Sequence, residues 1–148
     1  MNDIVCISPV DGSEVARRPI ATEAEVTAVL AGARRAQQDW AKVPLAERKS
    51  RMLAFLDVMR MQNEEVVPEL AMQMGRPVRY GGELRSLEER VRVLVELSDE
   101  ALAPIVPVER AGFRRMIKRM PAGVVLVIAP WNYPYLTAVN AVVPALLA

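Results

Sequence analysis

The chain has 148 residues with 19 Lys and Arg against 18 Asp and Glu, and its net charge of +1 gives no electrostatic reason to expect a polyanionic partner. Hydrophobic residues make up 52%, which is enough to fill the core of one domain and excludes disorder as a description of the whole chain. Histidine is absent and Cys6 is the only cysteine, which excludes an internal disulfide, a Cys/His zinc site, a Ser-His-Asp triad and a Cys-His pair.

The N-terminal residues predict a β-hairpin followed by a helix. Turn-forming residues at 8–12 separate two short segments, 4–7 and 15–20, as the strands of a hairpin require. Thr22 then precedes Glu25 by three residues, which is the spacing of a capping box at a helix start. The residues that fall on one face of the expected helix are Val26, Val29, Leu30, Ala33, Gln37 and Trp40.

Three further helices are expected before residue 104. One covers 44–61, and Asn63 suits the cap of the next, which Gly75 ends because glycine readily takes the left-handed conformation. Pro68 lies inside this third helix, so the helix either starts later than Asn63 or is kinked there. A long helix follows over 83–103. The residues expected to form the apolar faces are Leu45, Met52, Leu53, Leu56, Met59, Leu84, Leu87, Val91, Leu94 and Ala101.

The last third of the chain has a different character. A basic cluster consists of Arg110, Arg114, Arg115, Lys118 and Arg119, whereas residues 122–148 carry no charge at all. The run Val124–Ile128 suits a strand buried on both faces of a parallel sheet, and 136–148 suits an apolar helix. Because no second strand of this kind is present, we expect the fold to continue beyond residue 148.

The segment between that strand and that helix is the most specific motif. Open α/β folds bind ligands where a parallel strand passes into a helix, and Pro130 and Pro134 restrict the backbone on either side of Asn132. A neutral amide at this place can donate a hydrogen bond to a developing oxyanion. The alternative is a proline-stiffened connection in which Trp131 fills the core and Asn132 caps the next helix.

The sequence of this motif and of the regions before it resembles a known family. The run PAGVVLVIAPWNYP, followed by NAVVPALLA, resembles the NAD(P)-dependent aldehyde dehydrogenase superfamily, and SPVDGSEV, PLAERKSRML and the stop at 74–77 resemble its N-terminal region in the same order. The resemblance implies an α/β fold with a helical N-terminal region and the first strand-turn-helix of a Rossmann-like cofactor domain, truncated. It divides the chain into a hairpin and helices (1–105), oligomerisation-type strands (106–120) and the start of the cofactor-binding domain (121–148).

The resemblance also implies roles for particular residues of an oxidoreductase. Asn132 matches the family's oxyanion-hole asparagine. The positions that match contacts to NAD or NADP are Ile128, Ala129, Pro130 and Trp131. The positions that match the lining of the substrate tunnel, for a small-molecule aldehyde, are Tyr133, Thr137 and Asn140. The family's mechanism uses a cysteine thiolate as nucleophile and a glutamate that activates water, and both are expected beyond residue 148. Residues 1–148 are therefore expected to be inactive alone and to form a homo-oligomer only within the full-length enzyme.

Other interpretations of the same features stay open. The basic cluster suits nucleic acid, but only Phe113 is available within it for base stacking, so a subunit-facing strand pair is preferred and no nucleic-acid or membrane partner is expected. Residues 122–148 are long enough to cross a bilayer, although their prolines and asparagines would interrupt the helix. The chain would then be a short non-catalytic protein, either a truncated relic or a tail-anchored membrane polypeptide.

The first residues, the single cysteine and the methionines each support one further expectation. The first residues lack a basic region that leads into an apolar run, so we expect no secretory signal and a cytoplasmic location. Cys6 is interpreted as a small apolar strand residue and not as a nucleophile. The methionines on helix faces are interpreted as core residues, with no metal site.

Overall fold

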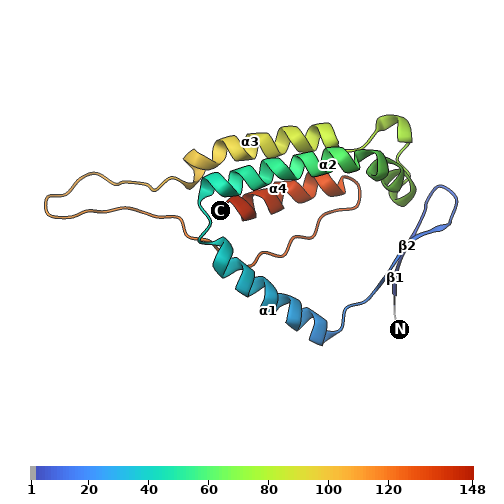
Figure 1. The fold of residues 1–148 in the computed structure, drawn as a ribbon, viewed down its shortest axis with the longest axis horizontal. Helices are drawn as coiled ribbons and strands as arrows, with labels where there is room; N and C mark the ends of the chain where they lie inside the picture. Colours follow the sequence, from blue (N-terminus) through green and yellow to red (C-terminus); the bar gives the residue numbers. More distant parts are fainter. Residues whose placement is uncertain (1–2) are drawn as a thin grey trace.

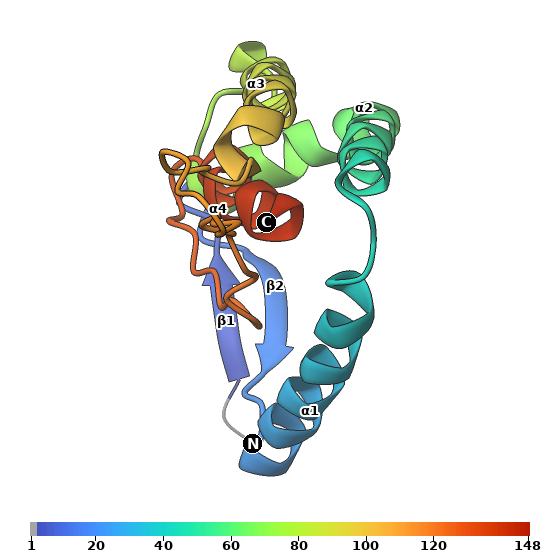
Figure 2. The same ribbon diagram turned by 90° about the vertical axis from the view of Figure 1, so that its left-hand side faces the viewer.

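The computed structural model describes residues 3–148 of the chain. Its elements in chain order are β1 (Asp3–Ile7), β2 (Glu14–Pro19), α1 (Glu23–Trp40), α2 (Leu45–Met74), a short 3-10 helix η1 (Val78–Tyr80), α3 (Leu84–Leu102) and α4 (Pro134–Leu147). Figure 1 shows α2, α3 and α4 side by side, whereas α1 and the hairpin β1–β2 extend away from them. Figure 2 shows the same separation from the side.

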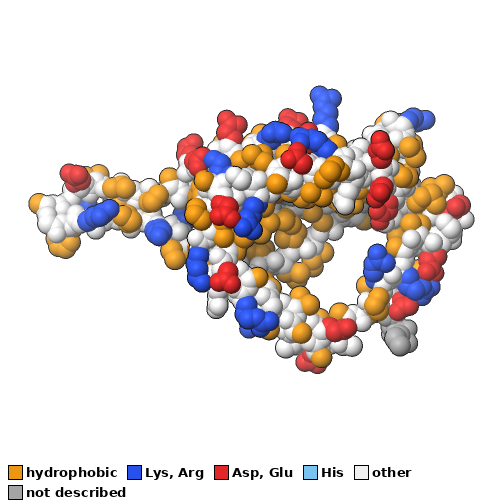
Figure 3. Space-filling view, viewed as in Figure 1, with side chains coloured by type: hydrophobic (Ala, Val, Ile, Leu, Met, Phe, Trp, Pro, Cys, Tyr) orange, Lys and Arg blue, Asp and Glu red, His pale blue; other side chains and the backbone are white. Residues whose placement is uncertain are grey.

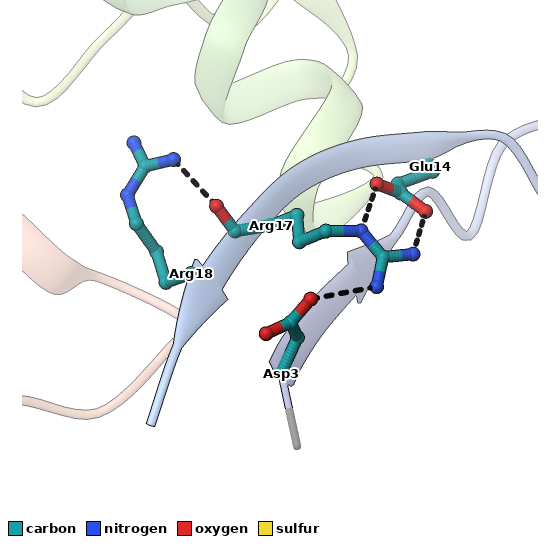
Figure 4. A network of polar contacts seen from close by, with 4 residues as sticks. All are labelled: Asp3, Glu14, Arg17 and Arg18. Carbon is teal, nitrogen blue, oxygen red and sulfur yellow. Dashed lines mark hydrogen bonds and ion pairs between the residues drawn. The ribbon is translucent and has the colours of Figure 1, made fainter. Parts of the chain in front are cut away.

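The hairpin forms where the sequence predicts it. β1 and β2 pair antiparallel, and the register shifts between Cys6 and Ile7. The Arg17 guanidinium binds both carboxylate oxygens of Glu14, at 2.8 and 2.5 Å, and reaches Asp3 across the sheet at 3.1 Å (Figure 4). The hydrogen bond from Arg17 lowers the pKa of the Glu14 carboxyl. These ion pairs are exposed, so they contribute little to the stability of the sheet.

Helix α1 begins at the predicted capping box. The Thr22 hydroxyl accepts from the Glu25 backbone N–H at 3.3 Å, and the Thr22 backbone N–H donates to the Glu25 carboxylate at 2.7 Å. Most of the apolar face of this helix is uncovered, since Val26, Val29 and Leu30 stay exposed and the contacts with α2 and α4 lie at its C-terminal end, around Trp40. Figure 3 shows hydrophobic side chains around the open space between α1, the hairpin and the other helices.

The predicted break at Asn63 is wrong, because α2 runs without interruption from Leu45 to Met74 and includes Pro68. A proline removes one intrahelical hydrogen bond and kinks the helix, and a kink was one of the two alternatives that the sequence left open. Figures 1 and 2 show the last part of α2 turned away from its first part. Leu70 and Ala71 beyond the proline are buried, so tertiary packing holds the second part in place. Gly75 ends the helix in the left-handed conformation, as predicted, with φ 73°.

The core lies between the three packed helices. Its buried members are Met52 and Leu56 of α2, Leu87, Val91 and Val95 of α3, and Val139, Val143 and Leu147 of α4. These positions repeat every three or four residues along each helix, which turns one stripe of each helix toward the other two. Among the predicted core residues, Leu53 and Ala101 are exposed instead.

The predicted strands over 106–120 form only two isolated bridges, which pair Ile105 with Ile117 and Arg110 with Phe113. The segment projects from the helices as a long loop (Figure 1), and its basic cluster is exposed. A regular ladder is not formed because prolines at 104 and 107 and the bend at Gly112, with φ 80°, interrupt strand pairing.

The predicted strand Val124–Ile128 has no partner within residues 3–148, where the segment is unpaired and largely exposed. A strand that is buried on both faces needs neighbours to satisfy its backbone groups, and within the described residues none lies beside it. The apolar helix at the end is confirmed as α4, which has 14 residues. No helix in the described part of the chain has the length and apolar character needed to cross a membrane.

Candidate functional site

The candidate site is built around residues 129–133, which connect the extended segment 121–128 to α4. Two prolines fix the backbone on either side, and Pro134 forms the first turn of the helix, where its missing N–H costs nothing. The side chains at the start of this connection are open to solvent, with Ile128 86% and Trp131 75% exposed. Trp131 therefore does not fill the core, which was one interpretation of the sequence.

The carboxylate of Glu83, the residue that precedes α3, caps α4. The Oε2 atom of Glu83 accepts from the Leu136 backbone N–H at 2.7 Å, whereas Tyr133 at the N-cap position supplies no side-chain hydrogen bond. The Glu83 side chain is 2% exposed. A negative charge next to the N-terminus of a helix is favourable, because the first N–H groups of the helix lack partners there. The alternative that Asn132 caps this helix is thus wrong.

Arg76 joins this carboxylate to the turn. Its guanidinium lies 3.4 Å from Glu83 Oε1 and donates through another nitrogen to the main-chain oxygen of Asn132 at 2.9 Å. Its carbon Cζ also lies 4.6 Å from the centre of the Tyr133 ring, which is a cation–π distance. One side chain that is only 13% exposed therefore contacts three groups: the carboxylate of Glu83 and two neighbouring residues of the turn.

The side chain of Asn132 is exposed, and its amide has no hydrogen-bond partner among residues 3–148. The turn is fixed through the main-chain oxygen of this residue, so its amide N–H groups remain available to a ligand. A neutral amide donor needs no proton transfer before it can stabilise a negative oxygen.

The three residues predicted to line a substrate tunnel have different surroundings. Tyr133 stacks on Arg76, next to Asn132. The Thr137 hydroxyl donates to the main-chain oxygen of Tyr133, within the first turn of α4. Asn140 lies further along α4, where its Oδ1 accepts from Arg90 of α3 at 2.7 Å. The structure thus brings Tyr133 and Thr137 together at the turn and places Asn140 against α3.

A pocket of about 460 Å³ lies beside the turn. Its lining mixes polar and apolar groups from α3, α4, the turn and the segment around η1, and it includes Arg76, Tyr80, Glu83, Ser86, Tyr133 and Leu136. Tyr135 is the neighbouring phenol; its pKa is raised by burial and, to a smaller extent, by the charges of Glu69 and Glu83. The pocket therefore joins one cationic and one anionic group to an aromatic wall.

A second pocket of about 370 Å³ is apolar and lies between α1, α4 and the extended segment. It is lined by Ala33 and Trp40 of α1, by Val124, Val125 and Val127, and by Val142 and Leu146 of α4. This surface is formed by the residues predicted to be a buried strand and by part of the apolar face of α1.

The residues predicted to contact a nicotinamide cofactor offer apolar surface and main-chain groups. Ile128, Ala129, Pro130 and Trp131 are exposed and consecutive, which suits contact with a flat ring. Phosphate groups need cationic partners or a free helix N-terminus, whereas residues 122–148 carry no charge and the N-terminus of α4 is occupied by the Glu83 carboxylate. The chemistry present therefore fits the ring of such a cofactor, and partners for the phosphates must come from other residues. Within residues 3–148, no cluster of three or more Cys, Asp or Glu side chains could hold a metal ion.

Sequence reasoning missed Arg76 and Glu83 as functional residues. The sequence identified the stretch 74–77 only as a helix stop and Glu83 only as a helix start. Arg76 lies 56 residues from Asn132 along the chain, and Glu83 lies 53 residues from Leu136. No local pattern links positions so far apart, so the contacts depend on the packing of α3 against α4.

Comparison with known proteins gives a consistent result. The family model described as "Aldehyde dehydrogenase family" matches residues 1–148. N-succinylglutamate 5-semialdehyde dehydrogenase of Vibrio cholerae is 32% identical over 125 residues, which cover 84% of this chain and 26% of that protein. The crystal structure of PnpE with nicotinamide adenine dinucleotide matches with a TM-score of 0.86 and 30% identity, and covers 99% of this chain and 30% of that one.

A third match comes from NADP-dependent glyceraldehyde-3-phosphate dehydrogenase of Bacillus halodurans, solved with NADP, at a TM-score of 0.86 and 25% identity. It covers 99% of this chain and 32% of that structure. The chain therefore spans between a quarter and a third of the length of the proteins that it matches. The matches to complete α/β enzymes confirm the predicted fold class over this part of their length.

Proposed function

The chain belongs to the aldehyde dehydrogenase family and corresponds to its N-terminal portion, and we propose that it works within an enzyme that oxidises an aldehyde to a carboxylic acid with NAD or NADP. The observation that carries the proposal is the family match over all 148 residues. It is supported by relatives that are dehydrogenases of aldehydes and by similar structures that were solved with NAD or NADP.

In this proposal Asn132 is the oxyanion donor. When a nucleophile attacks an aldehyde, the carbonyl oxygen gains negative charge, and a donor held in place for that charge lowers the barrier. The exposed amide of Asn132, which has no partner among residues 3–148, supports this role, as do the prolines on either side of it. Tyr133, Thr137 and Asn140 are proposed as neighbouring residues on the substrate side.

Ile128, Ala129, Pro130 and Trp131 are proposed to form the cofactor contact. A nicotinamide cofactor supplies a hydride acceptor when it is bound. The exposed side chains of Ile128 and Trp131 would cover a flat ring and exclude water from one side of it. The choice between NAD and NADP depends on contacts to the ribose, and the proposal assigns these contacts to no residue of this chain.

The nucleophile and the general base are proposed to lie outside residues 1–148. The proposed chemistry needs a cysteine thiolate that attacks the aldehyde and a glutamate that activates water to hydrolyse the thioester. Cys6 is half-buried in β1, where it pairs with Ala16 of β2, and we assign it a packing role. Residues 1–148 alone are then expected to have no turnover.

The projecting segment 106–120 is proposed to contact other subunits. Its apolar side chains, including Val106, Val108 and Met120, are exposed over much of their surface. Apolar surface of this kind is common where subunits meet. Val108→Glu in the complete enzyme is expected to lower the assembled mass measured by light scattering, and an unchanged mass would contradict the proposed contact.

The activity is tested by comparing the complete native polypeptide with residues 1–148. Both are assayed for the reduction of NAD and of NADP with a panel of aliphatic and aromatic aldehydes. We expect turnover from the complete polypeptide only. Turnover by residues 1–148 alone would contradict the location of the nucleophile, and a complete polypeptide that oxidises none of the aldehydes would contradict the proposed activity itself.

A further inference from the structure

We propose that Arg76 and Glu83 are positioning residues that hold the turn 130–133 in one conformation and so fix the Asn132 amide for catalysis. The inference rests on the proposed function, because it assigns these two side chains an effect on Asn132. Neither residue is assigned a contact with substrate or cofactor, so both would act only through the turn.

The side chain of Glu83 is buried, with 2% of its surface exposed. A carboxylate that is 98% buried needs partners that compensate for the loss of water. It has one on each oxygen: the Leu136 N–H at 2.7 Å on Oε2 and Arg76 at 3.4 Å on Oε1. Because the first of these is an N–H group of α4, the position of the helix start is tied to a charged group that is costly to displace.

The shape of the Arg76 side chain allows it to make several contacts at once. A guanidinium is a planar fork that can bind an anion and a carbonyl at once and also stack on an aromatic ring. Here it contacts Glu83, the main-chain oxygen of Asn132 at 2.9 Å and the ring of Tyr133 at 4.6 Å. A lysine ammonium carries the same charge but lacks the planar fork that makes these three contacts together.

The contacts of Arg76 and Glu83 leave the side-chain amide of Asn132 free. Arg76 holds the main-chain oxygen of Asn132, the ring of Tyr133 and, through Glu83, the N–H of Leu136. The connection is thus held at Asn132 and Tyr133, and the first turn of α4 is held at Leu136, while the side-chain amide of Asn132 is not among the groups used. Asn132 therefore has a restrained backbone and an exposed side-chain amide, as a catalytic donor requires.

The positions of the two residues are themselves restricted. Arg76 follows Gly75, whose left-handed φ of 73° turns the chain out of α2. Glu83 follows Gly82, where a Cβ atom would lie 2.9 Å from Asn63 Oδ1 and 3.2 Å from a methyl group of Val67. Both residues are thereby held against α2, which belongs to the core of the molecule.

The inference is tested by a double-mutant cycle in the complete enzyme, with the single-turnover rate of hydride transfer as the measurement. If Arg76 acts through Asn132, Arg76→Met lowers the rate about 10-fold in the wild-type background and less than about twofold in the Asn132→Ala background. An equal loss in both backgrounds would show an independent effect and overturn the inference.

Matched controls separate positioning from folding. Arg85→Met removes an exposed arginine of α3 and Glu89→Gln neutralises an exposed glutamate of the same helix; both should keep the wild-type rate. Glu83→Gln keeps an acceptor for Leu136 but loses the charge next to Arg76, and its loss of rate should follow that of Arg76→Met. If Arg76→Met fails to fold in thermal unfolding measurements, Arg76→Lys carries the same cycle.

The outcomes distinguish this inference from the proposed function. If Asn132→Ala keeps the wild-type rate, the role of Asn132 is wrong and the inference falls with it. If Asn132→Ala loses rate while Arg76→Met and Glu83→Gln do not, only the inference is overturned. A loss in both single variants that is not multiplied in the double variant supports it.

Discussion

The indole N–H of Trp40 donates to the main-chain oxygen of Leu146 at 2.8 Å, across 106 residues of sequence. Trp40 is the last residue of α1 and Leu146 lies in the last turn of α4, so the bond joins the ends of the two helices. Arg51 of α2 lies over the same indole, with its Cζ 5.3 Å from the ring centre. α1, whose apolar face is otherwise uncovered, is attached to the three packed helices at this place.

Trp40→Phe should therefore lower the free energy of unfolding by about 1 kcal/mol, because the ring is kept while the donor to Leu146 is lost. Urea titration of the free energy measures the change. Trp131→Phe is the matched control: that indole is exposed and should change stability by less than about 0.5 kcal/mol. Equal effects in the two variants would contradict the assigned role of the Trp40 bond.

The core packing predicts a contrast between two leucines of α2. Leu56 has 0% of its surface exposed, whereas Leu53, one turn away, is 37% exposed. Leu56→Ala should cost about 2–5 kcal/mol in unfolding free energy because it leaves a cavity between three helices. Leu53→Ala should cost about 1 kcal/mol or less. Urea titration of both variants gives the comparison, and a larger loss for Leu53 would mean that the core is placed wrongly.

Two glycines should respond to alanine with opposite signs. Gly75 has φ 73°, and a Cβ there would lie 3.0 Å from Pro9, so Gly75→Ala should destabilise the protein by about 1–2 kcal/mol. Gly32 is inside α1, where a Cβ would have only Arg35 within 4.0 Å, so Gly32→Ala should stabilise by about 0.5–1 kcal/mol. The midpoint of thermal unfolding should fall for the first variant and rise for the second.

The capping box of α1 predicts a pH dependence. The pKa of Glu25 lies below its ordinary value of 4.5, first because of the hydrogen bond from the Thr22 backbone and second because of the Thr22 hydroxyl. A carboxyl with a lowered pKa in the folded state contributes stability above its ordinary pKa, and that contribution disappears as the pH falls through the lowered value.

Thr22→Ala removes the hydroxyl bond to Glu25 and keeps the bond from the Thr22 backbone N–H, so the Glu25 pKa should rise part of the way toward 4.5. NMR titration of the Glu25 carboxyl carbon in both proteins measures the shift. An unchanged midpoint would show that the hydroxyl does not contribute. At neutral pH the same variant should lose about 1 kcal/mol of stability through the lost cap.

The proposed role of Asn132 predicts a separation between chemistry and cofactor affinity in the complete enzyme. Asn132→Ala should lower the rate of acylation about 10²- to 10³-fold, with little change in the Kd of NAD or NADP. Asn132→Asp should be impaired as strongly, because a carboxylate has the same shape and no N–H to donate. Burst-phase and equilibrium binding measurements separate the two effects. A normal rate in Asn132→Asp would remove the amide from the mechanism.

The local elements were predictable from the sequence because short-range chemistry determines them. The capping box at Thr22, the glycine stop at Gly75, the hairpin and the apolar helix after Pro134 each depend on residues within a few positions of one another. The predicted capping box agrees with the start of α1 at Glu23, and the helix predicted over 83–103 agrees with α3 within one residue at each end. The roles of the residues around Asn132 remain predictions from the resemblance.

Wherever an element depends on a distant partner, the sequence was a poor guide. The sequence places a helix cap at Asn63 and leaves a later start or a kink open at Pro68, but packing of the residues beyond the proline keeps α2 continuous. The apolar run Val124–Ile128 has the composition of a buried strand, yet it forms no ladder because a strand needs a neighbour.

The sequence by itself determined the helical faces, the turns and the family, since each of these depends on short patterns of residue type. Only the tertiary structure decided that Glu83 caps α4 and that Arg76 holds the turn beside Asn132. Contacts between residues more than 50 positions apart arise from the packing of α2, α3 and α4. A charged side chain that is buried in this packing loses its water and is stabilised by the polar groups that the fold places next to it.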